Sequence, residues 1–378
     1  MASPNTLTGL LPVIYEAYDI VSRELTGMIP AVTMDASADR VAKDEVVRWP
    51  VTPVLSSATL VPAATGPDPA ARTIGNDTMT IDNLEGTGFQ WEGEESNTVR
   101  FETIMRDSFA QSFRTLANKI EVDLCELYVN ASRAYGTSGT TPFASTLADP
   151  ANILRILQDN GAPTGDLQLV IDTVAGAKMR TLGQLTKANE AGDDSMLRRG
   201  VLMDIHGFMI RESAGIQTHT AGTATGFDAN GGEPVGETTI VVDGSDSGTI
   251  LQGDHVSWAG DSEKYIVQSA TATGAASGNI VISNPGLQSA LATTVEGTLG
   301  ATYTANMGFA RSAIRLMARA PMRPAADNAE DVVYVTDPVS GLTFEITQYG
   351  QYRRVAYEVA IAWGVKMVKP EHCAILLG

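Results

Sequence analysis

The chain has 378 residues, and its 26 lysines and arginines against 44 aspartates and glutamates give a formal net charge of −18. Because affinity for nucleic acid comes from clustered cations, this balance argues against a protein that grips nucleic acid through the phosphates. With 43% hydrophobic residues the chain has ample material for a packed core. A chain longer than about 250–300 residues is expected to form more than one domain.

Membrane and secretory signals are absent from the sequence pattern. No apolar run approaches the roughly 18 residues of a membrane span. The N-terminal stretch carries no basic segment before an apolar one, so we expect no signal peptide. Cys125 and Cys373 lie far apart in the sequence, and we expect them to be free thiols in a reducing compartment rather than a disulfide framework.

Residues 10–26 show the apolar spacing of an amphipathic helix. Pro12 suits the first turn, Gly27 suits the C-terminal cap, and Pro30 stops the helix. The apolar stripe consists of Leu10, Val13, Ile14, Ala17, Val21 and Leu25. We expect this face to pack on the core of its own domain or on a neighbouring subunit.

Residues 36–97 have little helical period and are rich in Pro, Gly, Thr and Asp. Strand patterns occur at residues 46–51, 79–82 and 89–92. The segment has too few apolar residues to form a core alone, so we predict a long extended β-hairpin that projects from a body. Its aromatic residues Trp49, Phe89 and Trp91 are either docking anchors for another subunit or local packing across the hairpin.

Residues 98–135 carry the strongest helical signal in the chain. One continuous apolar stripe is formed by Phe101, Ile104, Met105, Ser108, Phe109, Phe113, Leu116, Ile120, Leu124, Leu127, Tyr128 and Ala131. Gly136 follows the predicted end. At 1.5 Å per residue this helix would be on the order of 55 Å long, which predicts a spine that spans the body.

Residues 149–215 alternate between helix and strand patterns. A helix is predicted from Asp149 and Pro150 to Gly161, followed by a buried strand at residues 167–171. Residues 173–189 predict a second helix. Two short strands are expected within residues 201–213.

Residues 216–303 change character again, because Lys264 is the one lysine or arginine in the stretch. Short strand patterns recur at residues 239–242, 255–258, 265–268 and 279–282, separated by turn clusters. This spacing is typical of a small β-barrel or sandwich, and we predict an inserted all-β domain.

Residues 304–378 return to a mixed pattern. A helix is predicted from the spacing of Met307, Ala310, Ala313, Ile314 and Met317. Residues 331–336 and 342–348 predict a hairpin, and residues 353–368 and 374–377 predict further strands.

The sequence offers little that resembles a catalytic or metal site. It has no nucleotide-binding, zinc-protease or serine-hydrolase motif, and its four histidines are not at metal-ligand spacing. Ser195, Asp204 and His206 could be drawn as a hydrolase triad, but a solvated loop is the favoured interpretation. Residues 243–248 resemble a calcium loop faintly and are interpreted as a turn. We therefore expect no catalytic residue, no metal and no cofactor.

Several segments, taken in their shared order, resemble one family of structural proteins. They are residues 12–17 and 23–32, residues 197–200, 205–208 and 211–213, residues 248–254 and 256–260, and residues 309–314, 363–366 and 369–371. In these segments the chain resembles the major capsid (coat) proteins of tailed bacteriophages with the Hong Kong 97 (Johnson) fold. More narrowly, it is similar to the short-tailed-phage coat family that carries an inserted β-barrel domain.

The resemblance implies an α+β fold with six parts. These are an N-terminal arm with an amphipathic helix (1–35), an extended β-hairpin loop (36–97), the spine helix with the peripheral domain (98–148), an axial and peripheral α/β body (149–215), the inserted small all-β barrel (216–303), and a return to the body with a closing helix and strands (304–378).

The resemblance also implies a function. Such subunits assemble as pentamers and hexamers into the icosahedral head of a phage, around double-stranded DNA that they do not bind sequence-specifically. Partners would be further copies of the chain, portal and scaffolding proteins and a decoration protein, and assembly would occur in the bacterial cytoplasm without a membrane. Candidate intersubunit contacts are Val13, Tyr15, Trp49, Phe89 and Trp91.

Three other functions stay open at the level of sequence. An encapsulin-type nanocompartment shell protein would share the fold but enclose protein cargo. An enzyme would use the cluster around Asp204 and His206. A β-rich binding or adhesion module would lie in residues 216–303.

Overall fold

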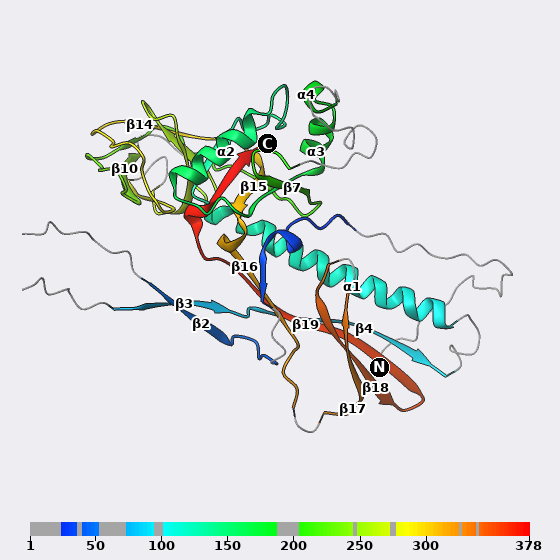
Figure 1. Cartoon of the computed structure of the whole chain (residues 1–378). Coiled ribbons are helices and arrows are strands. Elements are labelled where there is room, and N and C mark those ends of the chain that lie inside the picture. The colour runs from blue at the N-terminus through cyan, green and yellow to red at the C-terminus, as the bar shows by residue number, and fades with distance from the viewer. Residues whose placement is uncertain are drawn as a thin grey trace, which may run out of the picture.

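The computed structural model describes residues 24–35, 40–52, 73–93, 101–186, 204–244, 248–272, 277–324, 327–337 and 340–378. Their β structure forms a six-stranded sheet, a twelve-stranded sheet and a separate two-stranded sheet. A long helix, α1, runs diagonally across the molecule between the two larger sheets (Figure 1). Across these ranges, none of the helices has the length and apolar character that a membrane crossing needs.

Helix α1, Phe101–Cys125, lies where the sequence predicts the spine, but it is shorter than predicted. Its 25 residues span about 38 Å. The chain then tightens into a 3-10 turn, Glu126–Asn130, and continues as strand β5, Arg133–Gly136. The prediction of one helix to residue 135 is wrong because β5 pairs in parallel with the last strand, β20, Cys373–Leu377. The apolar stripe continues past the helix because the turn packs on the same core.

The six-stranded sheet holds most of the C-terminal strands. Its members are β1 (Thr33–Asp35), β4 (Asn83–Glu92), β16 (Ile314–Arg319), β17 (Ala329–Thr336), β18 (Thr343–Gln351) and β19 (Arg354–Met367). The order is β1-β16-β19-β18-β17, and β4 pairs with β19 as well. Helix α1 covers one face, where Phe113 stacks on Phe344 with ring centroids 5.0 Å apart. The predicted hairpin and the long strand at residues 353–368 are confirmed.

The closing helix predicted from Met307 to Met317 is wrong. The segment forms strand β15, Tyr303–Ala310, a 3-10 turn at Arg311–Ala313, and strand β16. Strand β15 lies between β20 and β6, Leu167–Ile171, and is buried on both faces. A strand buried on both faces reads as a nearly continuous apolar run, so its spacing can match a helix by chance.

The helices of the upper body pack against the twelve-stranded sheet. They are α2 (Ala148–Asp159), α3 (Thr173–Arg180) and α4 (Gly183–Thr186), and the sheet here also includes β7 (Phe208–Glu212) and β8 (Thr218–His219). Asp172 caps α3 by accepting a hydrogen bond from the amide of Ala175 at 2.9 Å. The single helix predicted over residues 173–189 is broken after Arg180, because Leu182 and Leu185 turn into the core. Residues 187–189 lie outside the described residues.

Six short strands within residues 227–299 close on one another. They are β9 (Phe227–Ala229), β10 (Thr239–Gly244), β11 (His255–Trp258), β12 (Lys264–Ala270), β13 (Gly278–Ile282) and β14 (Glu296–Leu299). The order β11-β14-β9-β10-β13-β12 is completed by pairing of β11 with β12. The ring has its own hydrophobic cluster around Trp258 and Phe227 and is attached through β12 to β5. It is at the upper left in Figure 1.

The two-stranded sheet consists of β2, Val46–Val51, and β3, Gly75–Thr80, paired antiparallel. Figure 1 shows it to the left of the six-stranded sheet, in continuation of β4. We call β2 and β3 the arm, and this name does not include the N-terminal arm expected at residues 1–35. Strand β4 belongs to the body sheet, so the part of the predicted loop at residues 83–92 does not project.

Candidate functional site

The candidate site is built from two anchors in the described part of the chain. One holds the base of the arm, and the other holds the N-terminal segment, residues 24–32. The N-terminal helix predicted over residues 10–26 lies largely outside the described residues, together with Val13 and Tyr15. Its predicted end is wrong, because residues 24–26 are not helical.

The arm is held at its base by charged and aromatic side chains. Trp49 of β2 lies beside two cations of the body sheet, Arg315 of β16 and Lys366 of β19. The Arg315 guanidinium carbon lies 4.8 Å from the centre of the Trp49 ring, and the Lys366 ammonium lies 5.8 Å from it. Lys366 also donates to the Asp77 carboxylate of β3 and to the Thr78 carbonyl, the latter at 2.6 Å. Trp49 therefore has partners in its own chain.

Phe89 and Trp91 lie on β4 rather than on the arm. The Phe89 ring contacts Phe109 of α1 at 4.9 Å between centroids and Tyr357 of β19 at 5.5 Å. Trp91 lies edge-on to Phe89 at 6.5 Å. Of the two interpretations that the sequence left open, these contacts match local packing. A contact of Trp49, Phe89 or Trp91 with another subunit stays a prediction.

The N-terminal segment is anchored by a carboxylate that sequence reasoning missed. Glu121 of α1 is 2% exposed and accepts hydrogen bonds from the amides of Gly27, Met28 and Ile29 at 2.6, 2.7 and 2.9 Å. The Ser213 hydroxyl donates to the same carboxylate at 2.6 Å. These four donors supply both oxygens of a buried carboxyl group with hydrogen bonds, so residues 27–29 are held against α1.

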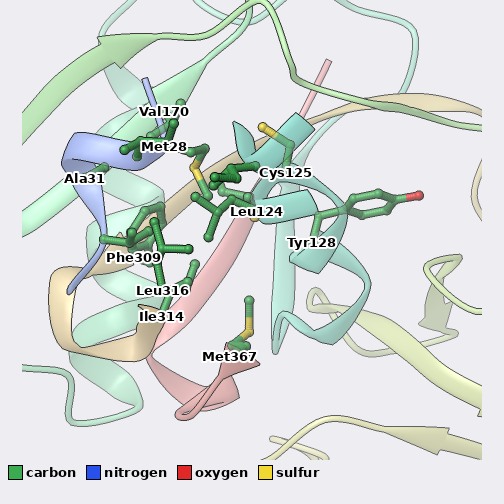
Figure 2. Close-up of a cluster of buried hydrophobic side chains, with 14 of the residues drawn as sticks. Met28, Ala31, Leu124, Cys125, Tyr128, Val170, Phe309, Ile314, Leu316 and Met367 are labelled. Atoms are coloured by element: carbon green, nitrogen blue, oxygen red, sulfur yellow. The ribbon is translucent and has the colours of Figure 1, made fainter. Parts of the chain in front are cut away.

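Further contacts on either side of the Glu121 hydrogen bonds also hold the N-terminal segment against the body. Met28 and Ala31 point into a cluster that includes Leu124, Phe309 and Leu316 (Figure 2). Ala31 ends a 3-10 turn, Ile29–Ala31, whose first amide is one of the Glu121 donors. At the surface, Arg114 and Asn118 of α1 bind the Glu24 carboxylate and lower its pKa to about 2.

A buried polar network attaches the ring of strands to the end of α1. The Tyr128 hydroxyl lies 2.8 Å from Nδ1 of His219, whose Nε2 lies 2.8 Å from Oδ1 of Asp254. The Tyr303 hydroxyl donates to the Gly253 carbonyl at 2.6 Å. The His219–Asp254 pair resembles the histidine and aspartate of a catalytic triad. These side chains are only 6% and 0% exposed, so a substrate has no access to them. The network positions the ring on the body.

The proposed hydrolase triad is not assembled in the described residues. Asp204 and His206 are both exposed in the turn before β7, and Ser195 lies outside the described residues. His206 has a left-handed φ of 52°, which places it at the corner of that turn. Residues 245–247 of the faint calcium-like loop also lie outside the described residues. The exposure of Asp204 and His206 agrees with the solvated loop that the sequence favoured at this position.

The described residues also offer no candidate site for metal or thiol chemistry. Within the described residues, no group of three or more His, Cys, Asp or Glu side chains is placed to hold a metal ion. Cys125 and Cys373 are free and buried. Burial raises the pKa of both thiols above the ordinary range, so neither is a thiolate near neutral pH.

A pocket of about 550 Å³ opens beside the turn between β18 and β19. Trp91 and Tyr357 line it together with Arg353 and Arg354. Tyr352, at the tip of this turn, is 91% exposed. Aromatic and arginine side chains are enriched in protein–protein contacts, so the composition of this end of the sheet is typical of a surface that contacts another protein.

The sequence matches no protein-family profile and no curated protein. Among solved structures, the chain is similar to the capsid of the Cyanophage P-SCSP1u, with a TM-score of 0.53, 12% identity, and coverage of 97% of this chain and 92% of that one. It is also similar to a structure from Mycobacterium phage Che8, with a TM-score of 0.48, 13% identity and 98% of each chain covered. A virus-like particle from Pyrococcus furiosus gives a TM-score of 0.42 at 9% identity, with 93% and 92% of the chains covered. The similarity to the cyanophage capsid covers almost the whole length of both chains. This chain therefore has the fold of a bacteriophage capsid subunit, as the sequence resemblance predicted.

Proposed function

We propose that this protein is the structural coat protein of a tailed bacteriophage, and that it self-assembles as pentamers and hexamers into an icosahedral head around double-stranded DNA. The observation that carries the proposal is the capsid fold shared over nearly the full length of the chain. In this proposal the subunit follows the Hong Kong 97 plan with the boundaries expected from the sequence: 1–35, 36–97, 98–148, 149–215, 216–303 and 304–378. Two parts are amended: residues 83–92 belong to the body sheet, and strands β15 and β16 stand in place of the closing helix.

The arm supports a role in contacts between subunits. An isolated two-stranded sheet is marginally stable in water, and the arm has only a small apolar cluster at its base. Val46 of β2 is 43% exposed, and Ile74, the residue before β3, is 63% exposed, so the arm and the chain that enters it present apolar surface that the body does not cover. Burial of that surface on a neighbouring copy would stabilise both partners. The arm and the N-terminal segment are therefore the proposed contacts between neighbours.

The arrangement of the positive charges fits a container for DNA. Many of the described lysines and arginines are ion-paired within the chain: Arg40, Arg106, Arg114, Lys119, Arg133, Arg155, Arg180, Arg311, Arg319, Arg323, Lys366 and Lys369. The one cation in residues 216–303, Lys264, donates to the Gly136 carbonyl. Cations engaged in this way attract few phosphates, so DNA can be packed and released without adhering.

DNA binding by the isolated subunit tests this point. We expect an affinity for duplex DNA weaker than about 1 µM even at low salt, because the net charge of −18 repels the phosphates and many of the cations are already paired with carboxylates. Fluorescence anisotropy with a labelled duplex measures it. Nanomolar affinity would contradict the picture of a container that does not grip its contents.

Electron microscopy of the purified protein tests the proposed function. We expect uniform closed shells, formed by the protein alone or with a scaffolding protein, and we expect portal and decoration proteins as further partners. Subunits that remain monomeric in every condition, even with a scaffolding protein supplied, would contradict the proposed function. Terminase, portal and scaffolding genes, if found next to the gene for this protein, would favour a phage head over a nanocompartment. The proposed location is the virion, after assembly in the bacterial cytoplasm.

A further inference from the structure

The base of the arm joins two cross-strand pairs, one from each sheet. Arg315 of β16 and Lys366 of β19 are directly opposite each other in the body sheet. Trp49 of β2 and Asp77 of β3 are directly opposite each other in the arm. The arm pair lies against the body pair, with the Trp49 ring near both cations and the Asp77 carboxylate bound by Lys366.

The body pair by itself is unfavourable, because two like charges directly opposite in a sheet repel. The arm supplies what this pair lacks, namely the negative face of an aromatic ring and a carboxylate. Burial by itself raises the pKa of Asp77. The hydrogen bonds from Lys366 and from the Thr78 amide lower the pKa by more than burial raises it, so the net pKa lies below the usual value. Asp77 is therefore charged near neutral pH, and the two pairs are complementary in charge.

The remaining contacts at the base are of two kinds. Backbone hydrogen bonds join Val41, which precedes β2, to Ala320 and Met322 of the body, and they fix where the chain enters the arm. A small apolar cluster packs Val47 and Trp49 against Val41, Met79, Ile81, Met317 and Ala362. Apolar contact is not directional, so this cluster permits the arm to tilt. The ion pair and the ring contacts depend on distance and orientation, so they select one position of the arm.

We propose that Trp49, Asp77, Arg315 and Lys366 form an arm lock, which sets the angle at which the arm leaves the body and thereby the curvature of the assembled shell. The inference rests on the proposed function, since curvature has meaning only for a shell. In a shell, the arm angle decides where a neighbouring copy is contacted. A looser arm then allows several angles between neighbours and several shell sizes.

Two lock variants, one matched control and one conservative variant test the arm lock. Lys366→Gln removes the cation that contacts both the ring and Asp77. Trp49→Leu keeps an apolar side chain in the cluster but removes the ring. Lys369→Gln removes a lysine three residues away, whose ion pair with Glu371 does not involve the arm. Lys366→Arg restores a cation and is expected to restore the behaviour of the native protein.

The first readout is hydrogen–deuterium exchange of the amides in β2 and β3, measured on unassembled subunits. We expect exchange on the order of tenfold faster in Lys366→Gln and in Trp49→Leu, with no change in Lys369→Gln. The second readout is the distribution of shell diameters by electron microscopy. We expect one diameter for the native protein and for Lys369→Gln, and several diameters or open sheets for the two lock variants.

The outcomes separate the arm lock from the proposed function. Native exchange rates in both lock variants would overturn the lock, whether or not shells form. Faster exchange with shells of native diameter would overturn its link to curvature. A native protein that forms no shells would refute the proposed function, while the exchange rates would still decide whether the lock holds the arm.

Discussion

Replacement of Glu121 by alanine is expected to lower the free energy of unfolding by about 4 kcal/mol, because buried donors left without an acceptor cost about 1–3 kcal/mol each. The variant removes the acceptor for three backbone amides, those of Gly27, Met28 and Ile29, and for the Ser213 hydroxyl. Part of that cost is offset when water enters the space and when the hydroxyl rotates. Urea denaturation followed by circular dichroism measures the change.

The control for this prediction lies on the same stretch of chain. Glu126 is an exposed carboxylate five residues further along, so Glu126→Ala is expected to change stability by no more than about 0.5 kcal/mol. Glu121→Gln keeps one oxygen as an acceptor and should fall between the native protein and Glu121→Ala. A Glu121→Ala variant within about 1 kcal/mol of the native protein would show that the carboxylate does not hold the N-terminal segment.

Stability is expected to fall by up to about 3 kcal/mol between pH 6.5 and pH 4 through His255. Its side chain is 5% exposed, and burial lowers its pKa to about 4, with the nearby Lys264 acting in the same direction and Asp254 opposing it. The unfolded chain has the ordinary pKa near 6.5 and therefore binds more protons in this range. The stabilising contribution is complete above pH 6.5 and is lost as the pH falls toward 4.

His255→Gln removes the titrating ring and is expected to flatten this part of the pH profile. Thermal melts at half-unit pH steps measure the difference between the variant and the native protein. Burial also lowers the pKa of His372, so only the difference between the two profiles belongs to His255. His206→Asn replaces an exposed histidine and is the control substitution. Parallel profiles for the native protein and His255→Gln would contradict the prediction.

Local patterns in the sequence predicted the elements whose environment is one-sided. Helix α1 has a single buried stripe, from Leu116 to Leu124, and such a face repeats with the helical period. The hairpin of β17 and β18 was predicted from two strand patterns separated by the turn residues 337–341. Strand β15 was missed because both of its faces are buried, between β6 and β20, and only the tertiary structure decides that.

The candidate site divides in a similar way. Trp49 was singled out from the sequence because an aromatic residue in a polar segment needs a partner. The partner could not be predicted, because Arg315 and Lys366 lie more than two hundred residues away and reach Trp49 only once β16 and β19 are paired. Glu121 gave no signal at all, since a glutamate within a helix is normally a solvated side chain.

The sequence by itself determined the acidic balance, the long helix, the all-β character of residues 216–303 and the resemblance to phage coat proteins. Each of these follows from composition, from periodicity or from segments read in order, which are properties of neighbouring residues. Only the tertiary structure decided that Glu121 clamps the N-terminal segment and that the arm rests on two opposed cations. Those contacts join residues up to about three hundred positions apart, and their stability comes from burial and charge that exist only after the strands have paired.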